Sequence, residues 1–366
     1  MRIALVHYTA LPVIAGVELV MAEHARLFRA AGHEVTIVAG FEDDEAVENL
    51  RPILARQEVV FLHNVMTMHF RLALTAALWR LSEELPPVRF VCWIHDLAAC
   101  NPDYAPLPLD RAPWDLLAKA NPRCTYVAVS DLRRRQFLAL TGHPAIRCRT
   151  IPNGVDPIRI LDLAPRVAAL AQRYDLPGRE IVLVHPARLL RRKNVELTLR
   201  VTAALKAAGH SCACLLTALP EVQHAASGAY EAEVHRLQAR LGLEADAFFL
   251  HDPEPLNERD LHAVFRLADA LFFPSRQEGF GIPVLEAALH RLPIFCTDLE
   301  PLNALLTRGV TTFPLEAAPE EIATLIVTTL DADRAHAARK QTLRTYSWDA
   351  IYRNFLSPLL SETETA

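Results

Sequence analysis

Residues 270–287 have the sequence ALFFPSRQEGFGIPVLEA, in which a glycine-containing loop separates an apolar segment from the start of a helix. The apolar segment 270–273 is typical of a buried strand. Pro283 suits the first turn of a helix because it lacks an N–H that would be unpaired there. Gly279 and Gly281 allow the backbone to approach a ligand closely, and the first amides of the helix attract an anion. The stretch therefore predicts a strand, an anion-binding loop and a helix.

Two carboxylates accompany this loop: Glu278 lies in it, and Glu286 lies inside the predicted helix. Acidic residues near a helix start are common because they favour the helix dipole, and the E-x7-E spacing alone also arises by chance. The glycine loop and the preceding strand favour a functional interpretation, in which amides bind an anion and carboxylates bind hydroxyl groups. A nucleotide sugar carries both kinds of group.

The segment E-G-F-G-I-P-x-L-E-A resembles the E-x7-E signature of retaining glycosyltransferases with the two-domain GT-B architecture, the family 4 type. The resemblance implies that Glu286 binds the ribose hydroxyls of the donor nucleotide and that Glu278 approaches hydroxyls of the transferred sugar. It also implies that the loop of Gly279, Phe280 and Gly281 binds the donor. The amides of Phe280 and Gly281 are expected to face the sugar and the diphosphate.

Length and composition favour a two-domain protein of a reducing compartment. A chain of 366 residues with 51% hydrophobic residues can bury two cores. The formal net charge of −5 argues against a nucleic-acid-binding protein, which is normally basic. Seven cysteines without a C-x-x-C pair argue against a disulfide framework or a zinc site. We find no signal-peptide pattern and no long apolar span, so we expect a cytoplasmic protein, and peripheral contact with the inner face of the membrane stays open.

Short apolar runs alternate with helical patterns and predict an α/β fold with two doubly wound parallel sheets, each Rossmann-like and covered on both faces. By the resemblance, the two domains face a central cleft in the GT-B manner. Ligands of such sheets bind at the carboxyl ends of the strands. The predicted strands are 3–7, 35–39, 59–62, 90–94, 126–129, 181–185, 212–217, 247–250, 270–273 and 294–296.

Turn chemistry in residues 151–157, IPNGVDP, marks the expected domain boundary. We expect an N-terminal domain over 1–154 on the acceptor side, a linker over 155–177, and a C-terminal domain over 178–342 on the nucleotide-sugar donor side. The resemblance implies that the last helix, within 345–366, crosses back and completes the N-terminal domain.

A cationic segment, Pro186 to Asn194, follows the predicted strand 181–185. Departure of a sugar from a diphosphate requires positive charge at the developing anion, and arginine with lysine can supply it. By itself the segment would be a solvated basic loop. Its position after a strand and its similarity to the family's G-R-x-x-x-x-K-G element imply instead that Arg188 and Lys193 grip the diphosphate.

The cationic segment departs from the family pattern twice, because Ala187 and Asn194 replace its two glycines. Asparagine still tolerates a left-handed backbone, so the second replacement is mild. We expect Arg191 and Arg192 to face solvent.

The family's N-terminal loop, usually G-G-x-E, corresponds to Ala15-Gly16-Val17-Glu18. The resemblance suggests that Gly16 lets the backbone approach the donor diphosphate. Ala15 is a departure, and the alternative is a plain helix entry in which Glu18 favours the dipole. The G-x-G-x-x-G pattern of an NAD-binding fold is absent.

His95 and Asp96 follow the predicted strand 90–94. A histidine at a strand end is often structural. The resemblance places the family's H-D histidine beside the donor sugar, so we expect His95 to be catalytic together with Glu278, Arg188 and Lys193.

Two other charged patterns have simpler explanations. Arg133 to Arg135 follow a serine suited to helix capping, and a solvated helix face is favoured over contact with phosphate, an acidic acceptor or lipid head groups. The D-x-D spelling at 331–333 and the acidic run 43–45 are expected to be solvated rather than metal-binding. We therefore expect no metal and no cofactor.

These observations predict a retaining glycosyltransferase that moves a hexose from a nucleoside diphosphate sugar, of the GDP-mannose or UDP-glucose type, to a hydroxyl acceptor. The acceptor is a saccharide, a lipid-linked glycan or a small molecule, and nucleic acid is not a partner. The alternatives are an epimerase or phosphorylase of similar architecture, a nucleotide-sugar-binding protein without catalysis, and a membrane-associated interaction protein.

Overall fold

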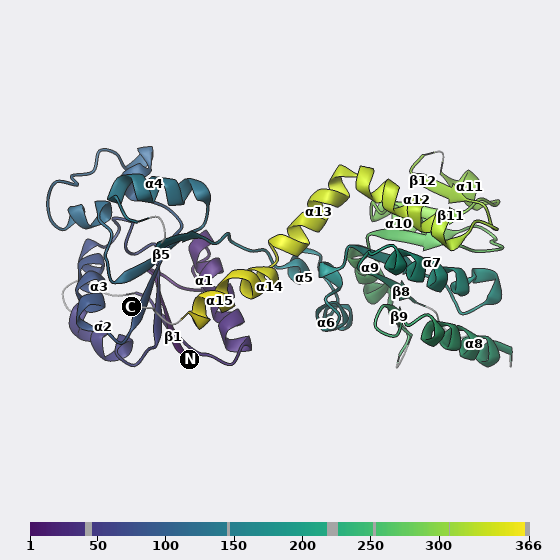
Figure 1. Cartoon of the computed structure of the whole chain (residues 1–366), viewed down its shortest axis with the longest axis horizontal. Coiled ribbons are helices and arrows are strands. Elements are labelled where there is room, and N and C mark those ends of the chain that lie inside the picture. The colour runs from purple at the N-terminus through teal and green to yellow at the C-terminus, as the bar shows by residue number, and fades with distance from the viewer. Residues whose placement is uncertain (41–45, 145–146, 218–225, 252–253, 307, 363–366) are drawn as a thin grey trace. The chain divides into compact units, whose positions relative to one another are not determined.

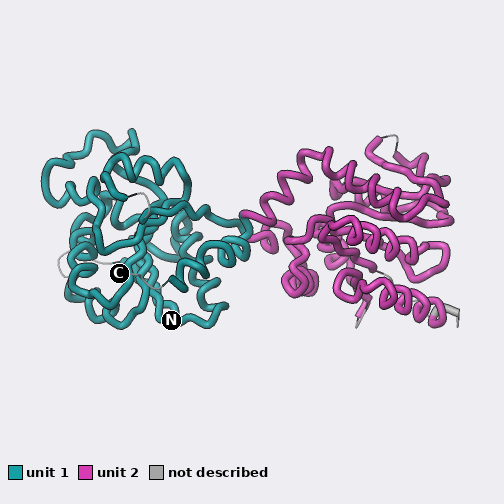
Figure 2. Tube along the Cα trace, in the orientation of Figure 1, with its two compact units in different colours: residues 1–155, 346–366 teal, residues 156–345 magenta. Residues whose placement is uncertain are grey.

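The computed structural model describes the chain except residues 41–45, 145–146, 218–225, 252–253, 307 and 363–366. It divides into two compact units, which are coloured separately in Figure 2. Unit 1 comprises Met1–Val155 with Tyr346–Ala366, and unit 2 comprises Asp156–Thr345.

Unit 1 is a parallel six-stranded sheet in the order β2-β1-β3-β4-β5-β6, with helices on both faces (Figure 1). Its side chains alternate between two cores, so that Ala4 and Val6 point to one face and Ile3 and Leu5 to the other. The elements are β1 Arg2–Val6, α1 Gly16–Ala30, β2 Glu34–Val38, α2 Ala46–Leu54, β3 Val59–His63, α3 Leu72–Glu84, β4 Arg89–Ile94, η2 Ala98–Cys100, η3 Pro102–Tyr104, η4 Trp114–Ala118, β5 Cys124–Ala128, α4 Asp131–Thr141 and β6 Cys148–Thr150.

Unit 2 is a second parallel six-stranded sheet, in the order β12-β11-β10-β7-β8-β9. It too separates two buried cores, with Val182 and Val184 on one face and Ile181 and Leu183 on the other. Its elements are α5 Pro157–Ile160, α6 Pro165–Arg173, η6 Leu176–Gly178, β7 Ile181–His185, η7 Arg191–Lys193, α7 Val195–Ala207, β8 Cys212–Leu216, α8 Ala226–Arg240, β9 Ala247–Phe249, α9 Glu258–Leu267, β10 Ala270–Phe273, α10 Ile282–Leu289, β11 Ile294–Thr297, α11 Leu302–Leu305, β12 Val310–Phe313, α12 Pro319–Ala332 and α13 Arg334–Thr345.

The predicted fold class, two doubly wound parallel sheets, is confirmed, and each of the ten predicted strands forms. Two further strands, β6 and β12, escaped prediction. Both lie at the edge of a sheet, and each buries a single residue, Cys148 or Phe313.

Residues 155–177, expected as a linker, belong almost entirely to unit 2. The carboxylate of Asp156 caps α5 by accepting from the amide of Ile158 at 2.9 Å. Val167 and Ala171 of α6 are buried in the same core as β7 and β10. The linker assignment was wrong because the helices of this stretch pack into the core of unit 2 and do not merely connect the two units.

The last residues return to unit 1 and end in three short helical elements, α14 Trp348–Ile351, the π-turn η8 Tyr352–Leu356 and α15 Ser357–Ser361. Their apolar side chains pack into the core that contains Ile3 and Phe28. The backbone of Val155 fastens this return because its amide donates to Tyr346 O at 2.7 Å and its carbonyl accepts from the Trp348 amide at 3.0 Å.

All seven cysteines are free thiols, and six of them are buried. Within the described residues, none of the helices has the length and apolarity needed to cross a bilayer.

Replacing Gly154 with alanine should destabilise unit 1. An added Cβ would lie 2.6 Å from Cδ2 of Trp348, so the indole that anchors the C-terminal segment must shift. Overpacking of this kind costs about 1–3 kcal/mol. The melting temperature should fall, and hydrogen-exchange mass spectrometry should show faster amide exchange in unit 1. The matched control is Gly228→Ala in α8, where a Cβ meets open space and stability should not fall. If Gly154→Ala and the native chain had the same melting temperature, the result would contradict the packing of Trp348 against Gly154.

Candidate functional site

The strand order of unit 2 places a topological switch point between β7 and β10, because the chain moves outward through β8 and β9 and then returns to the other side of β7. Open parallel sheets bind ligands outside the carboxyl ends of the strands at such a point. The cationic segment follows β7, and the glycine loop follows β10. Two segments that are about 85 residues apart in sequence therefore meet.

An ion pair between Lys193 and Glu278 joins these two segments. The Lys193 ammonium bonds to Oε1 of Glu278, and both side chains are largely buried, with exposed fractions of 12% and 6%. Ser275, fully buried after β10, donates its hydroxyl to the same oxygen at 2.5 Å. The ammonium also lies 5.1 Å from the centre of the Phe273 ring. The structure thus holds an anionic and a cationic residue of the predicted site, Glu278 and Lys193, in direct contact.

Asn194 and Arg192 connect the two loops further. The Arg276 amide donates to Arg192 O at 2.7 Å, and the Arg276 guanidinium donates to Oδ1 of Asn194 at 3.2 Å. Asn194 has a left-handed backbone, φ 56°, where the family pattern has glycine. Arg192 is exposed, as expected, but it also contacts the second loop, because its Nη1 lies 3.8 Å from Oε2 of Glu278 and donates to Gln277 O at 3.3 Å.

A cavity of about 260 Å³ opens beside this pair, with three cationic side chains in its wall. It collects Arg188 and Lys193, as predicted, together with Arg192. The lining residues are Pro186, Ala187, Arg188, Arg192, Lys193 and Thr217. A wall of this charge suits a multiply charged anion.

The glycine loop needs Gly281 but leaves room at Gly279. Gly281 has φ 104°, and a Cβ there would lie 2.5 Å from Cδ2 of Leu302. A Cβ on Gly279 would meet open space. Phe280 is 53% exposed, and no side-chain partner for Glu286 is found within the part of the chain that the structure describes. Glu286 therefore sits on α10 without a contact to the Lys193–Glu278 pair.

Unit 1 has its own cavity, of about 610 Å³, at the switch point between β1 and β3. It contains Gly16 and His95, the two predicted site residues of this unit. The lining residues are His7, Tyr8, Thr9, Ala15, Gly16, Val17, Glu18, Asn64, Phe70, His95, Val129 and Asn153.

His95 is a neutral, tightly held imidazole. Its Nε2 lies 3.1 Å from Nδ1 of His63, and its amide donates to Oδ1 of Asn64 at 2.8 Å. Burial, and next the charge that His7 would carry, lower the pKa of His95 to about 3. His95 can therefore exchange hydrogen bonds at neutral pH but does not supply a positive charge.

The arginines after β5 serve unit 1 itself. Arg133 pairs with Oδ1 of Asp96 at 2.9 Å, and Nε of Arg134 donates to Cys148 O at 2.7 Å. Arg135 is exposed. The solvated face that we expected therefore includes only Arg135, and Arg133 instead holds the loop that carries His95.

His7, His63 and Glu18 are buried polar residues whose place in this cavity region the sequence did not reveal. Nδ1 of His7 donates to His63 O at 2.7 Å, and its Nε2 lies 3.7 Å from Oε1 of Glu18. The available signal was position alone, because His7 follows β1 and His63 ends β3.

The D-x-D pattern at 331–333 lies where one helix ends and the next begins. Asp331 lies in the last turn of α12, and Oδ1 of Asp333 caps α13 by accepting from the Ala335 amide at 2.8 Å. The acidic run 43–45 lies outside the described residues. No cluster of three or more potential metal ligands occurs in the part of the chain that the structure describes.

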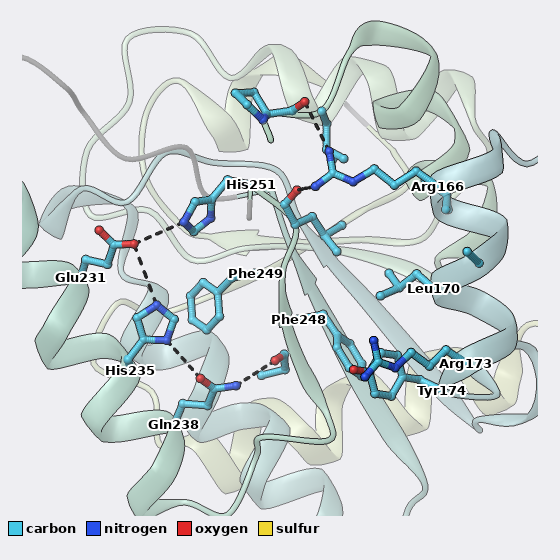
Figure 3. A pocket seen from close by; sticks show the side chains of 16 residues that line it. Arg166, Leu170, Arg173, Tyr174, Glu231, His235, Gln238, Phe248, Phe249 and His251 are labelled. Carbon is cyan, nitrogen blue, oxygen red and sulfur yellow. Dashed lines mark hydrogen bonds and ion pairs between the residues drawn. The ribbon is translucent and has the colours of Figure 1, made fainter. Parts of the chain in front are cut away.

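A larger cavity in unit 2, of about 920 Å³, holds none of the predicted site residues. Figure 3 shows it between α6, α8 and β9. Its polar groups bond mainly to one another: Arg166 donates to Leu250 O at 2.7 Å, and His251 lies 3.3 Å from Oε1 of Glu231. We therefore place the functional site at the switch points and not here.

Comparison with known proteins links the same part of the chain to glycosyl transfer. Residues 168–344, nearly all of unit 2, match the family model described as "Glycosyl transferases group 1". The chain is 27% identical to the D-inositol 3-phosphate glycosyltransferase of Streptomyces griseus over 57% of its own length and 45% of that relative's length. It is 28% identical to the alpha-D-kanosaminyltransferase of Streptomyces kanamyceticus over 43% of its length and 37% of that relative's length. The matched part thus spans less than half of either relative.

Among solved structures, Anabaena Alr3699/HepE in complex with UDP matches 99% of this chain and 100% of that chain, with 17% identity and a TM-score of 0.40. At that score the likeness adds nothing to what the two sheets show by themselves.

The buried histidines of unit 1 predict loss of its stability in acid. Burial lowers the pKa of His7, His24 and His95, in the last two to about 3, and lowers that of His63 well below its usual value. Below about pH 6.5 the unfolded chain therefore binds protons that the folded unit refuses, and stability falls by up to about 1.4 kcal/mol per pH unit for each histidine.

Hydrogen exchange of unit 1 between pH 7 and 5 measures this slope. His24→Leu should flatten it, since His24 is fully buried and neither ring nitrogen has a hydrogen-bond partner among the described residues. His185→Leu in unit 2 is the matched control and should leave the slope of unit 1 unchanged, although burial lowers its pKa to about 3 as well. Because His7, His63 and His95 remain, a smaller slope should persist in His24→Leu, and an unchanged slope would refute the assignment.

Proposed function

We propose that the protein is a glycosyltransferase that moves a hexose from a nucleoside diphosphate sugar to a hydroxyl acceptor with retention of configuration. The observation that carries the proposal is the Lys193–Glu278 pair at the β7/β10 switch point, inside the segment that matches the glycosyl transferase model. In this proposal unit 2 binds the sugar donor and unit 1 binds the acceptor.

The paired charges can separate when the donor binds. Lys193, Arg188 and Arg192 line one small cavity, where they can receive the diphosphate. Glu278 then accepts hydrogen bonds from sugar hydroxyls in place of the ammonium. Positive charge aimed at the diphosphate stabilises the leaving group where its negative charge develops. Glu286, which has no side-chain partner among the described residues, is proposed to bind the ribose hydroxyls.

The reaction breaks the bond between the anomeric carbon and the diphosphate oxygen and forms a bond to the acceptor oxygen on the same face. The acceptor proton goes to the departing diphosphate oxygen. In this route Glu278 binds sugar hydroxyls, and no side chain of the protein acts as a nucleophile. His95, being neutral, is proposed to bond to a sugar hydroxyl.

The donor is proposed to be of the GDP-mannose or UDP-glucose type, and a thermal-shift screen with UDP-, GDP- and ADP-sugars distinguishes these donors. A ligand at about 100 times its Kd raises stability by about 2.7 kcal/mol.

Contact with a membrane surface has weaker support, because Arg133 and Arg134 are engaged within unit 1.

Lys193→Met should abolish most of the transfer. Loss of a charge aimed at the leaving group typically lowers kcat about 10²–10³-fold. Steady-state transfer with the donor found in the screen measures the effect. Arg191→Met is the control, because Arg191 is 64% exposed and pairs with Glu233, and it should retain activity. Full turnover in Lys193→Met would instead favour different chemistry.

Turnover is expected to be independent of divalent metal ions, because we propose that three cationic side chains neutralise the diphosphate. The measurement is initial rate before and after treatment with EDTA, with added Mg²⁺ or Mn²⁺ as the reverse test. A rate that collapses with EDTA and recovers with Mg²⁺ would assign the leaving-group charge to a metal.

A further inference from the structure

The floor of the unit 1 cavity presents two hydrogen-bond acceptors to each other. Nδ1 of His7 must carry the proton, because it donates to a carbonyl, His63 O, at 2.7 Å. In the neutral ring, Nε2 then has a lone pair, and it lies 3.7 Å from Oε1 of Glu18. Burial, the largest influence, lowers the pKa of His7, which favours the neutral ring at neutral pH. Two acceptors cannot bond to each other, so they are arranged to receive a hydrogen-bond donor.

Glu18 has unused bonding capacity in the same place. Its side chain is buried, with an exposed fraction of the residue of 4%, and Oε2 has no partner among the described residues. Oε1 accepts from the hydroxyl of Thr9. A buried carboxylate oxygen without a partner is costly, because nothing replaces the water it has lost. A ligand hydroxyl would satisfy it.

The rim of this cavity is apolar. The segment Leu11–Ile14 lies in the chain between Thr9 and Ala15, which both line the cavity, and we call this segment the rim. It exposes Leu11 by 52%, Val13 by 50% and Ile14 by 78%. Such aliphatic exposure around a cavity is a feature of sites that bind apolar groups.

An aromatic wall continues the apolar surface into the cavity. Phe70 lines the cavity and is 55% exposed, and its ring packs edge-on against Tyr8 with the ring centres 5.6 Å apart. The hydroxyl of Tyr8 is used internally, donating to Met68 O at 2.9 Å, so its ring contributes mainly apolar surface. The cavity thus has a polar floor at His7 and Glu18 and an apolar wall and rim.

We propose that the acceptor of the transfer reaction is an amphiphile: a hydroxyl compound that carries an aliphatic chain beside its polar group. Its hydroxyl bonds to Glu18 and His7, and its chain lies along Phe70 and the Leu11–Ile14 rim. That this ligand is the acceptor of a transfer reaction rests on the proposed function, but its binding to the cavity can be tested without turnover.

The test is calorimetric titration of the full chain with alkyl β-glucosides, from methyl to octyl, below their micelle-forming concentrations. Affinity should rise roughly fourfold for each methylene that the wall and rim bury. Equal affinity for methyl and octyl glucoside, or no binding of either, overturns the proposal.

Two kinds of variant separate the polar floor from the apolar wall. Phe70→Ser and Ile14→Ser, both at exposed positions, should remove much of the gain with chain length and leave methyl glucoside binding unchanged. Glu18→Gln should weaken every member of the series by a similar factor, on the order of tenfold. Leu132→Ser is the control: it is 54% exposed on α4 of the same unit, outside the cavity, and should change nothing. A gain that survives both serine variants counts against the proposal.

Titration with UDP and GDP in the same experiment distinguishes this inference from the proposed function. Nucleotide binding without chain-length dependence overturns the amphiphilic acceptor alone. Chain-length dependence without binding of either nucleotide overturns the proposed transfer reaction and leaves the unit 1 site standing. Sedimentation with phosphatidylcholine vesicles tests whether the rim binds a membrane surface instead. Suppose that the vesicles bind, that Ile14→Ser abolishes this binding, and that glucoside affinity does not depend on chain length. The rim would then be assigned to a membrane surface, and the amphiphilic acceptor would be overturned.

Discussion

The contact between Lys193 and Glu278 is the constraint on which the candidate donor site depends. A carboxylate that is 6% exposed requires a partner, because breaking a buried ion pair by removing one side costs about 3–5 kcal/mol. The partner here comes from another strand of the same sheet. The pair therefore fixes the loop after β7 against the loop after β10, and the small cationic cavity is a consequence of that closure. Ser275 and Arg192 complete the coordination of Glu278, so its two oxygens are held in one orientation.

The same pair also reduces the mutual repulsion of the cationic side chains around the cavity. Three cations that line a cavity of about 260 Å³ would repel one another without a nearby acid. Glu278 offsets that repulsion when no anion is bound. In the proposed function, a diphosphate would replace the carboxylate as the partner of the cations, and sugar hydroxyls would replace the cations as partners of the carboxylate. Each charged group would then keep a charge partner or hydrogen-bond partner in both states, which lowers the free-energy cost of binding.

Much of the fold was predictable because parallel strands buried on both faces are short continuous apolar runs. The two missed strands, β6 and β12, break that rule, since each lies at a sheet edge and buries one residue. The error over 155–177 has a different cause. Pro157, Pro165 and Pro177 each sit in the first turn of a short helix, where a missing N–H costs nothing, and the packing of these helices into unit 2 is a contact between distant segments that the sequence does not show.

The candidate site was predictable to the extent that its residues follow strands, which is why Arg188, Lys193, Glu278 and His95 were proposed as site residues. Contacts between distant segments were not predictable, and so the contact of Arg192 with Glu278 and the pairing of Arg133 with Asp96 were missed. Unit 1 shows the limit most clearly. Glu18 looked like an ordinary acid in the first turn of a helix, and helix dipoles favour such acids whether or not they bind anything. Only its burial beside His7 distinguishes it, and the fold brings Thr9, Asn64 and Phe70 to the same cavity from separate segments. A helix-start acid in an α/β domain therefore becomes evidence of a binding site when its second oxygen is buried without a partner.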